Sequence, residues 1–432
     1  MNHRVLVISP HFPPVHAPDS ERIRMALPYM PEFGWDATVL SVRPDEVEAA
    51  RDILLARTVP LSIPVHRVRA IPVRWTRAFG AGNLALRSLP FLWQAGSRLL
   101  RGAFDLVFFS TTQYPVTVLG PWWRRRFGIP YVMDFQDPWW SDYYDRPGAP
   151  EPPGGRRKYA LSQALARGFE GTVVRGASHI VSVSPAYPTL LRRRYPDVSD
   201  SRFTALPFGA PARDFDSAAE WKVTQSIFDP NDGLTHWVYV GRGGADMAVA
   251  LRAMLTAVAR ARQADPSRWS ALRLHFLGTD YAPERAARKT VEPIARECGL
   301  AGIVDEQPGR IPYFQAIACL KDAHALLMPG SDDPAYSASK VYSCILARKP
   351  LLAVFHERSS VVDVLRATQA GVVITFSDRS DARRLSEDVE RQWFGSACRE
   401  SPPVDWSAFS VYTAREMTRR LCAVFQKAIQ HG

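Results

Sequence analysis

The chain is poor in several features that would define its class at once. It has only five cysteines in 432 residues, an odd number without paired spacing, which argues against a disulfide framework or a zinc site and favours a reducing compartment. No apolar run approaches the roughly 20 residues of a membrane-spanning helix. We find no internal repeat or low-complexity tract. The composition, with 46% hydrophobic residues, predicts a globular cytoplasmic protein with room for two packed domains.

Acidic residues are missing from one long segment. Between Val59 and Phe104 there is none, while seven arginines, Arg77 among them, alternate with aromatic residues such as Phe79. The run 122–126 repeats this mixture, and the whole chain carries a net charge of +11. Arginine with tryptophan on amphipathic segments is typical of contact with an anionic membrane surface, here the inner membrane face, and a solvated basic face is the alternative. Nucleic acid is not expected as a partner, because no nucleic-acid motif accompanies the charge.

Strands and helices alternate along both halves of the chain, as in doubly wound parallel sheets of the α/β class. A loop rich in proline and glycine is expected at 142–155, and a helical pattern closes the chain from 405 onward. The strands are expected at 5–8, 37–40, 106–109, 130–133, 179–183, 237–240, 272–277, 323–328 and 351–355.

Ligands of parallel sheets bind at the carboxyl ends of the strands, which selects three loops in the first half. Their candidate residues are His16 and Asp19, then Thr112 and Gln113, then Asp134, Gln136, Asp137 and Trp139. Carboxylates and tryptophan rings at the mouth of a sheet suit a pyranose, whose ring stacks on tryptophan while its hydroxyls bond to aspartate. Turn capping, a simple loop histidine and a core tryptophan are the structural alternatives.

In the second half, cations lie where helices are expected to begin. Gly241, Arg242 and Gly243 form the first strand-to-helix turn, and Lys340 follows a plausible N-cap at Ser337. A cation at a helix start is mildly unfavourable unless an anion lies in front of it, when the amide hydrogens and the ammonium group both point at the anion. A solvated lysine at a helix start is the alternative.

The run from Ser339 to Pro350 resembles the donor-site helix of group 1 retaining glycosyltransferases, which have the GT-B fold. Phe12-Pro13-Pro14, the run 31–35 and the run 134–139 resemble one branch of that family, with Gln136 in place of an arginine. Two positions differ, since the family usually has glutamate where this chain has Ser343 and Ala335.

The resemblance implies two Rossmann-like domains facing one another across a cleft. It places an acceptor-binding domain at 1–207, a donor-binding domain at 208–404, and a helix at 405–432 that crosses back to the first domain. Arg242 and Lys340 would hold the donor phosphates and, with Asp137, act in catalysis. The remaining implied donor contacts are Gly241, Gly243, Arg310, Ile311, Ser339 and Ser343.

The implied function is transfer of a sugar from a nucleotide-diphosphate sugar to a polysaccharide, lipid-linked or other cell-envelope glycan acceptor, with retention of configuration. The resemblance implies no metal ion and no cofactor beyond the nucleotide sugar as co-substrate. Two alternatives stay open. One is a degenerate relative that acts as a nucleotide-binding or scaffold partner, and the other is a nucleotide-sugar epimerase.

Overall fold

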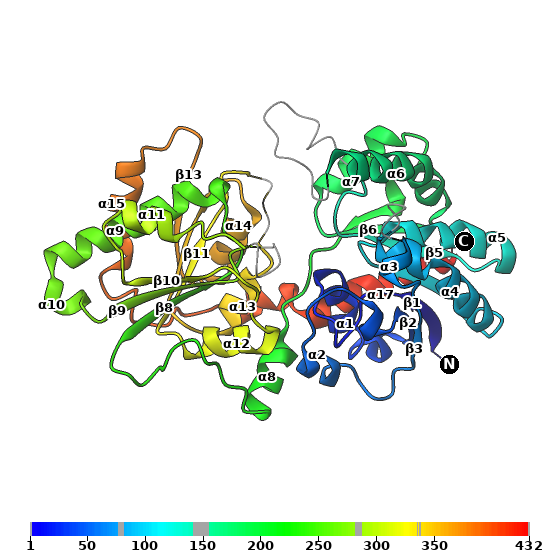
Figure 1. Ribbon diagram of the computed structural model, residues 1–432, viewed down its shortest axis with the longest axis horizontal. Coiled ribbons are helices and arrows are strands. Elements are labelled where there is room, and N and C mark those ends of the chain that lie inside the picture. Colours follow the sequence, from blue (N-terminus) through cyan, green and yellow to red (C-terminus); the bar gives the residue numbers. More distant parts are fainter. Residues whose placement is uncertain are drawn as a thin grey trace. The chain divides into compact units, whose positions relative to one another are not determined.

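The computed structural model describes residues 2–76, 82–140, 155–280, 287–334, 336 and 338–430. The chain divides into two compact units (Figure 1). The first unit comprises Met1–Gly209 together with Ala414–Gly432, and the second comprises Ala210–Thr413. Each unit contains one sheet whose strands are all parallel, which confirms the predicted α/β class.

The sheet of the first unit has the order β3-β2-β1-β4-β5-β6-β7, so the chain reverses its direction of winding between β1 and β4. The inner strands β1, β4 and β5 are apolar runs that are buried on both faces, as expected for a parallel sheet covered by helices. The strands are β1 (His3–Ile8), β2 (Trp35–Val42), β3 (Val65–Val68), β4 (Leu106–Ser110), β5 (Tyr131–Phe135), β6 (His179–Ser182) and β7 (Phe203–Ala205).

The helices of the first unit include the last helix of the chain, α17. Its buried face packs on the sheet, where the Phe425 ring lies edge-on to Trp35 at 5.2 Å and to Phe108 at 4.9 Å. The helices are α1 (Glu21–Ala26), α2 (Ile53–Arg57), α3 (Val73–Thr76), α4 (Leu84–Leu99), α5 (Leu119–Phe127), α6 (Arg156–Gly176), α7 (Ala186–Arg194) and α17 (Ala414–Gln430).

The second sheet repeats the arrangement with the order β10-β9-β8-β11-β12-β13, and its reversal lies between β8 and β11. Its strands are β8 (Thr235–Val240), β9 (Leu272–Leu277), β10 (Val304–Gln307), β11 (Ala325–Pro329), β12 (Leu351–His356) and β13 (Val372–Phe376). Its helices are α8 (Ala212–Glu220), α9 (Ala248–Ala264), α10 (Pro266–Trp269), α11 (Glu292–Glu297), α12 (Tyr313–Asp322), α13 (Val341–Leu346), α14 (Ser360–Thr368), α15 (Ala382–Trp393) and α16 (Trp406–Phe409).

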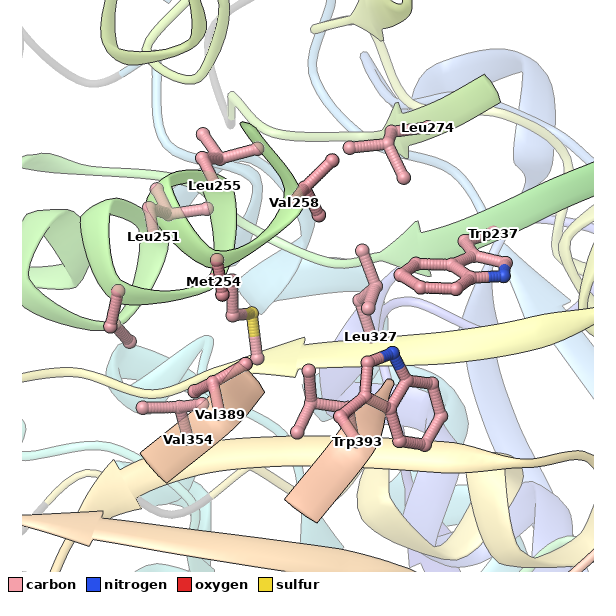
Figure 2. Close-up of a cluster of buried hydrophobic side chains, with 14 of the residues drawn as sticks. Trp237, Leu251, Met254, Leu255, Val258, Leu274, Leu327, Val354, Val389 and Trp393 are labelled. Carbon is pink, nitrogen blue, oxygen red and sulfur yellow. The ribbon is translucent and has the colours of Figure 1, made fainter. Parts of the chain in front are cut away.

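The core of the second unit lies between its sheet and the helices α9 and α15. Figure 2 shows Met254 of α9 and Trp393 of α15 beside side chains of the central strands. Trp393 meets Trp237 of β8 edge-on, with ring centroids 5.5 Å apart. Both tryptophans are fully buried, so each stabilises the unit by roughly 2–3 kcal/mol through removal of its surface from water.

Two predicted helices differ from the structure. Helix α13 begins at Val341, so Lys340 precedes it instead of lying in its first turn. The pattern predicted from 405 as one helix is divided into α16, a 3-10 turn at Ser410–Tyr412 and then α17. Arg77, Phe79, Ala335, Ser337 and most of the loop predicted at 142–155 lie outside the described residues. No helix in the described part of the chain combines the length and the apolar character needed to cross a membrane.

A buried histidine in the first sheet makes stability depend on pH. His179 of β6 lies against the Thr204 hydroxyl at 2.9 Å, and burial, with the charges of Lys427 and Arg202, lowers its pKa from 6.5 to about 4. Between these two pH values His179 is protonated in the unfolded chain but neutral in the folded chain, so the folded state loses stability as the pH falls. We expect a loss of about 2 kcal/mol between about pH 7.5 and pH 5.

Chemical unfolding of the wild type and of His179→Gln across this range tests the expectation. The variant should lose less stability on acidification than the wild type. His66→Gln, at an exposed histidine of β3, is the matched control and should keep the wild-type slope. Equal slopes for all three proteins would contradict the assignment.

Candidate active site

The carboxyl ends of β1, β4 and β5 come together at one edge of the first sheet, and Asp19 joins their loops. Its buried carboxylate accepts hydrogen bonds from His11 Nδ1 at 2.9 Å, from the Thr111 hydroxyl at 3.0 Å and from the Thr112 backbone N–H at 3.2 Å. Burial alone would raise the pKa of Asp19, but the bond and charge of His11, with the bonds from Thr112 and Thr111, lower it below its ordinary value. Asp19 is therefore an ionised group that fixes the loops.

A second buried carboxylate lies beneath this network. Asp134 accepts a hydrogen bond from Arg22 Nε at 2.7 Å and one from Gln136 Nε2 at 2.7 Å, while Gln136 also donates to the Asp19 backbone carbonyl. Arg22 donates in turn to the carbonyl of Leu206 at 2.7 Å. Burial raises the pKa of Asp134, and the Arg22 guanidinium offsets part of that rise. The ion pair thus ties the end of β5 to the segment through which the chain leaves the unit.

A cavity of about 260 Å³ opens beside the network. Thr112, Asp137 and Trp139 line it together with Tyr114, Asn83, Leu86, Pro115, Pro138, Ser162 and Leu165. The Tyr114 ring stacks on Trp139 with centroids 5.4 Å apart, and its hydroxyl accepts from the Asp137 backbone N–H at 3.1 Å and donates to the Asp137 carbonyl. Tyr114 therefore positions both the aromatic wall and the carboxylate at the mouth.

Asp137 differs from the other two aspartates of this edge because it is exposed. The protein atoms around its carboxylate and the negative charge of Asp19 nevertheless raise its pKa to about 6. Asp137 is ionised at neutral pH and can accept hydrogen bonds from a ligand. Asp19 and Asp134 are buried and already accept hydrogen bonds from protein donors.

The corresponding edge of the second sheet is basic. After β8 the chain turns tightly: a Cβ on Gly243 would lie 2.2 Å from the Thr290 hydroxyl, so a larger residue there would require the Thr290 side chain or the turn to shift. Arg242 pairs with Asp246 through two bonds of 3.0 and 2.6 Å, and its guanidinium lies over the Tyr336 ring at 4.4 Å. The arginine is thereby held in one orientation at the strand end.

Lys340 is the second cation of this edge. Part of the residue is open to solvent, but its ammonium group lies among enough protein atoms to lose hydration. That loss and the positive charges of Arg310 and Arg242 lower the pKa of Lys340 to about 8, against the opposing effect of the Cys344 thiol. Three cations from three separate loops therefore act on one small region, which is the electrostatic condition for binding a polyanion.

A buried glutamate holds the loop next to this region. Glu306 of β10 accepts from the Thr279 hydroxyl at 2.6 Å and from the backbone N–H groups of Thr290, Val291 and Glu292 at 2.8 to 2.9 Å. Since Thr290 touches the turn at Gly243, Glu306 fixes the wall of the basic region from behind. In the described residues, no three His, Cys, Asp or Glu side chains are placed to hold a metal ion.

The structure brings most of the predicted site residues of the first unit into two groups, the Asp19 network and the cavity. Asp19, Thr112, Asp134 and Gln136 share the network, while Thr112, Asp137 and Trp139 line the cavity. The Gln113 backbone N–H donates to the Thr111 hydroxyl at 2.9 Å. The His16 backbone N–H bonds to the Ala50 carbonyl, and His11, which was not predicted from the sequence, bonds to Asp19. The position of His11 directly after β1 was the available indication.

In the second unit, the predicted residues all lie on loops or the helix start at the carboxyl edge. Gly241 is buried and Ile311 is half-buried. Ser339 is exposed, and Ser343 is half-buried on α13. Tyr336 and Asp246, the partners of Arg242, were not predicted, because a bidentate pair and a cation-ring contact are made only in the folded loop.

Comparison with known proteins agrees with this geometry. Residues 20–209 match the family model of the Glycosyl transferase 4-like domain. This part of the first unit is therefore similar to a glycosyltransferase domain. This match confirms the predicted enzyme class. No curated protein is similar enough in sequence to count as a relative.

Solved structures with similar folds cover nearly the whole chain. A glycosyltransferase from Rickettsia africae has 10% identity and a TM-score of 0.58, and each chain is covered completely. HepE from Anabaena in complex with UDP-glucose has 13% identity and a TM-score of 0.57, with 98% and 99% covered. An α,α-trehalose 6-phosphate synthase from Burkholderia multivorans has 11% identity and a TM-score of 0.60, with 99% and 96% covered. The predicted GT-B fold is thus confirmed at the level of fold.

The buried Arg22–Asp134 pair can be tested through stability. Arg22→Met leaves a buried carboxylate without its counter-charge, which should cost about 3–5 kcal/mol of unfolding free energy. Arg22→Met combined with Asp134→Leu removes both charges and should recover most of that loss. Urea unfolding of the full chain measures both effects.

The exposed pair Arg175–Asp197, with the same 2.7 Å separation, is the matched control. Arg175→Met should cost less than about 1 kcal/mol, because water screens that pair. A cost for Arg22→Met no larger than for Arg175→Met would contradict a stabilising role of the buried pair.

Proposed function

We propose that the protein transfers a sugar from a nucleotide-diphosphate sugar to a cell-envelope glycan acceptor. The observation that carries the proposal is the placement of Arg242, Arg310 and Lys340 on the segments that follow β8, β10 and β11, at the carboxyl edge of the second sheet. The complexes of the HepE fold neighbour with UDP and UDP-glucose support a nucleotide-sugar donor. The sugar-transferase family match of the first unit supports the reaction class.

In this proposal Arg242 and Lys340 bind the donor diphosphate, and Arg310 adds positive charge to the region. As the glycosidic bond breaks, negative charge grows on the leaving diphosphate, and cations already in place stabilise it without reorganising. Gly241 and Gly243 let the backbone approach the phosphates. Arg310 with Ile311 lies beside the nucleobase and Ser339 with Ser343 beside the ribose and sugar. Because side chains supply the positive charge, the proposal includes no metal ion and no cofactor.

The acceptor would bind in the cavity of the first unit. Trp139, braced by Tyr114, offers an aromatic face for a sugar ring. Thr112 and the ionised Asp137 accept or donate hydrogen bonds to acceptor hydroxyls, and Asp137 orients the attacking one. Asp19, Asp134 and Gln136 keep these groups in place from below, while Gln113 and His16 lie on the flanking loops. The proposal also includes retention of configuration. The acceptor would be lipid-linked or a polysaccharide, and the protein would act at the cytoplasmic membrane face.

A catalytically degenerate protein is the second candidate, and one observation favours it. Asp246 holds Arg242 in a bidentate pair and so neutralises a cation that the donor needs. A protein of this kind would bind nucleotide and serve as a partner of an active transferase. Nucleotide binding without sugar transfer or donor hydrolysis would identify it, whereas turnover of a nucleotide sugar without acceptor would indicate an epimerase.

Nucleotide binding is the first test. We expect one of UDP, GDP, ADP or dTDP to raise the melting temperature of the wild type, since a ligand at about 100 times its dissociation constant stabilises by roughly 2.7 kcal/mol. Lys340→Ala should lose most of the shift. Lys321→Ala, at the end of α12 and the opposite edge of the sheet, is the matched control and should keep it. Absence of any shift in the wild type would overturn the donor assignment.

The lowered pKa of Lys340 gives binding a characteristic pH dependence. Free Lys340 loses its proton as the pH rises through about 8, so affinity for the nucleoside diphosphate should be constant near neutrality and fall above that value, by at most about tenfold per pH unit. Lys340→Arg keeps the charge at every accessible pH and should remove the decline. Calorimetric titrations across this range measure it, and an unchanged affinity in the wild type would rule out a phosphate contact by Lys340.

A further inference from the structure

An aromatic cluster lies on the outside of the first unit, where α4 and α5 run side by side (Figure 1). Trp93 of α4 meets Trp122 of α5 edge-on at 5.5 Å, and Trp122 meets Phe127 at 6.3 Å. Trp93 is 45% exposed and Trp122 is 39% exposed. Residues 29 positions apart thus form one apolar surface that no described part of the first unit covers.

Exposed arginines lie at the ends of the two helices that carry this cluster. Arg98 and Arg101 lie exposed at the end of α4, and Arg125 and Arg126 lie exposed at the end of α5. Neither helix contains an acidic residue, and the single one in α6, Glu170, is fully buried in a pair with Arg194. The surface is therefore basic without local compensation on α4 and α5.

A hollow lined by arginines lies next to the cluster. Between α5 and α6 an open depression of about 620 Å³ is lined by Pro121, Arg124, Arg125, Thr172, Arg175 and Gly176. Arg124 is held there by a 2.7 Å bond to the Gly176 carbonyl, and Arg175 pairs with Asp197. The hollow is large enough for a phosphate group, and it is bordered by donors that recognise one.

We infer that the α4–α5 face, meaning the aromatic cluster and the exposed arginines at the ends of the two helices, docks onto an anionic lipid bilayer. Tryptophan is favoured at the level of the headgroups because its ring is apolar and its N–H is polar. Arginine side chains lie along apolar surface while their guanidinium groups reach lipid phosphates. The complementarity of charge selects an anionic surface over a neutral one.

The docking surface also deepens the proposed function, on which this step rests. Leu86, which lines the acceptor cavity, lies seven residues before Trp93 on the same face of α4, about 10 Å away. A bilayer held at Trp93 would therefore lie beside the cavity. A lipid-linked acceptor could enter the cavity with its sugar while its chain stays in the membrane.

Vesicle flotation of the full chain without nucleotide tests the inference. We expect binding to phosphatidylcholine vesicles that contain phosphatidylglycerol and little binding to pure phosphatidylcholine. Each arginine near an anionic surface contributes about a fivefold factor, so Arg125→Gln with Arg126→Gln should weaken partitioning by about 30-fold. Arg383→Gln with Arg391→Gln, two exposed arginines of α15 in the second unit, should leave it unchanged.

A second double variant tests the contribution of the tryptophans separately from that of the arginines. Trp93→Ala with Trp122→Ala should weaken binding and leave the remainder more sensitive to salt, and the melting temperature of each variant shows that it is folded. Equal binding to neutral and anionic vesicles, or an unchanged affinity in the Arg125/Arg126 variant, would overturn the inference. Binding to duplex DNA that is as tight as binding to vesicles would instead identify a nucleic-acid surface. The vesicle and nucleotide experiments are independent. Loss of vesicle binding would not change the nucleotide-induced shift in melting temperature, and absence of that shift would not change vesicle binding.

Discussion

Parallel pairing of the strands is the constraint on which both units depend. A parallel strand cannot be followed by a tight turn to its neighbour, so each strand needs a crossover, and every loop that follows a strand emerges at the same edge. In both sheets the winding reverses beside the first strand, which leaves the loops after β1 and β4, and after β8 and β11, next to one another. The polar residues gathered there come from positions as far as 117 residues apart, yet the backbone topology makes them neighbours.

The two edges have opposite electrostatic characters. In the first unit, two carboxylates are buried and accept hydrogen bonds from the protein. Asp19 accepts from His11 and two threonines, and Asp134 accepts through Oδ2 from Arg22 and Gln136. Such groups fix loops but offer little to a ligand. Of the three aspartates described at this edge, Asp137 is the exposed one and can accept hydrogen bonds from a ligand. A cavity with one reactive carboxylate and an aromatic wall suits an uncharged ligand rich in hydroxyl groups.

In the second unit, three cations lie on loops at the carboxyl edge of the sheet. Asp246 pairs with Arg242, while loss of hydration and the charges of Arg310 and Arg242 lower the pKa of Lys340. A lysine in this state is electrostatically unfavourable without an anion, and a bound diphosphate would remove the penalty. The same concentration of positive charge therefore contributes to the lowered pKa of Lys340 and would favour binding of the proposed diphosphate. The basic α4–α5 face carries a second excess of positive charge, far along the sequence from the first, and both would act on phosphate groups.

The sequence by itself determined the class and much of the order of elements. Long apolar runs such as those of β1, β4 and β9 mark buried parallel strands, because both faces of such a strand are covered. Short or half-exposed strands escaped prediction. β3 lies inside the arginine-rich segment, and β10 contains Asp305, Glu306 and Gln307, because edge strands need few apolar residues. The helix start at Val341 and the division of the segment after 405 also depended on local geometry that periodicity does not specify.

Tertiary structure alone decided which site residues act together. The sequence placed His16 and Asp19 in one loop, but the histidine that bonds to the Asp19 carboxylate is His11, directly after β1. The pairs Arg22–Asp134 and Arg242–Asp246, and the contact of Trp93 with Trp122, likewise depend on loops and helices meeting in space. Composition and spacing predict the strands, and so they predict which strand a given loop residue follows. The direction of its side chain, its charge partner and its loss of hydration depend on neighbours that only folding supplies.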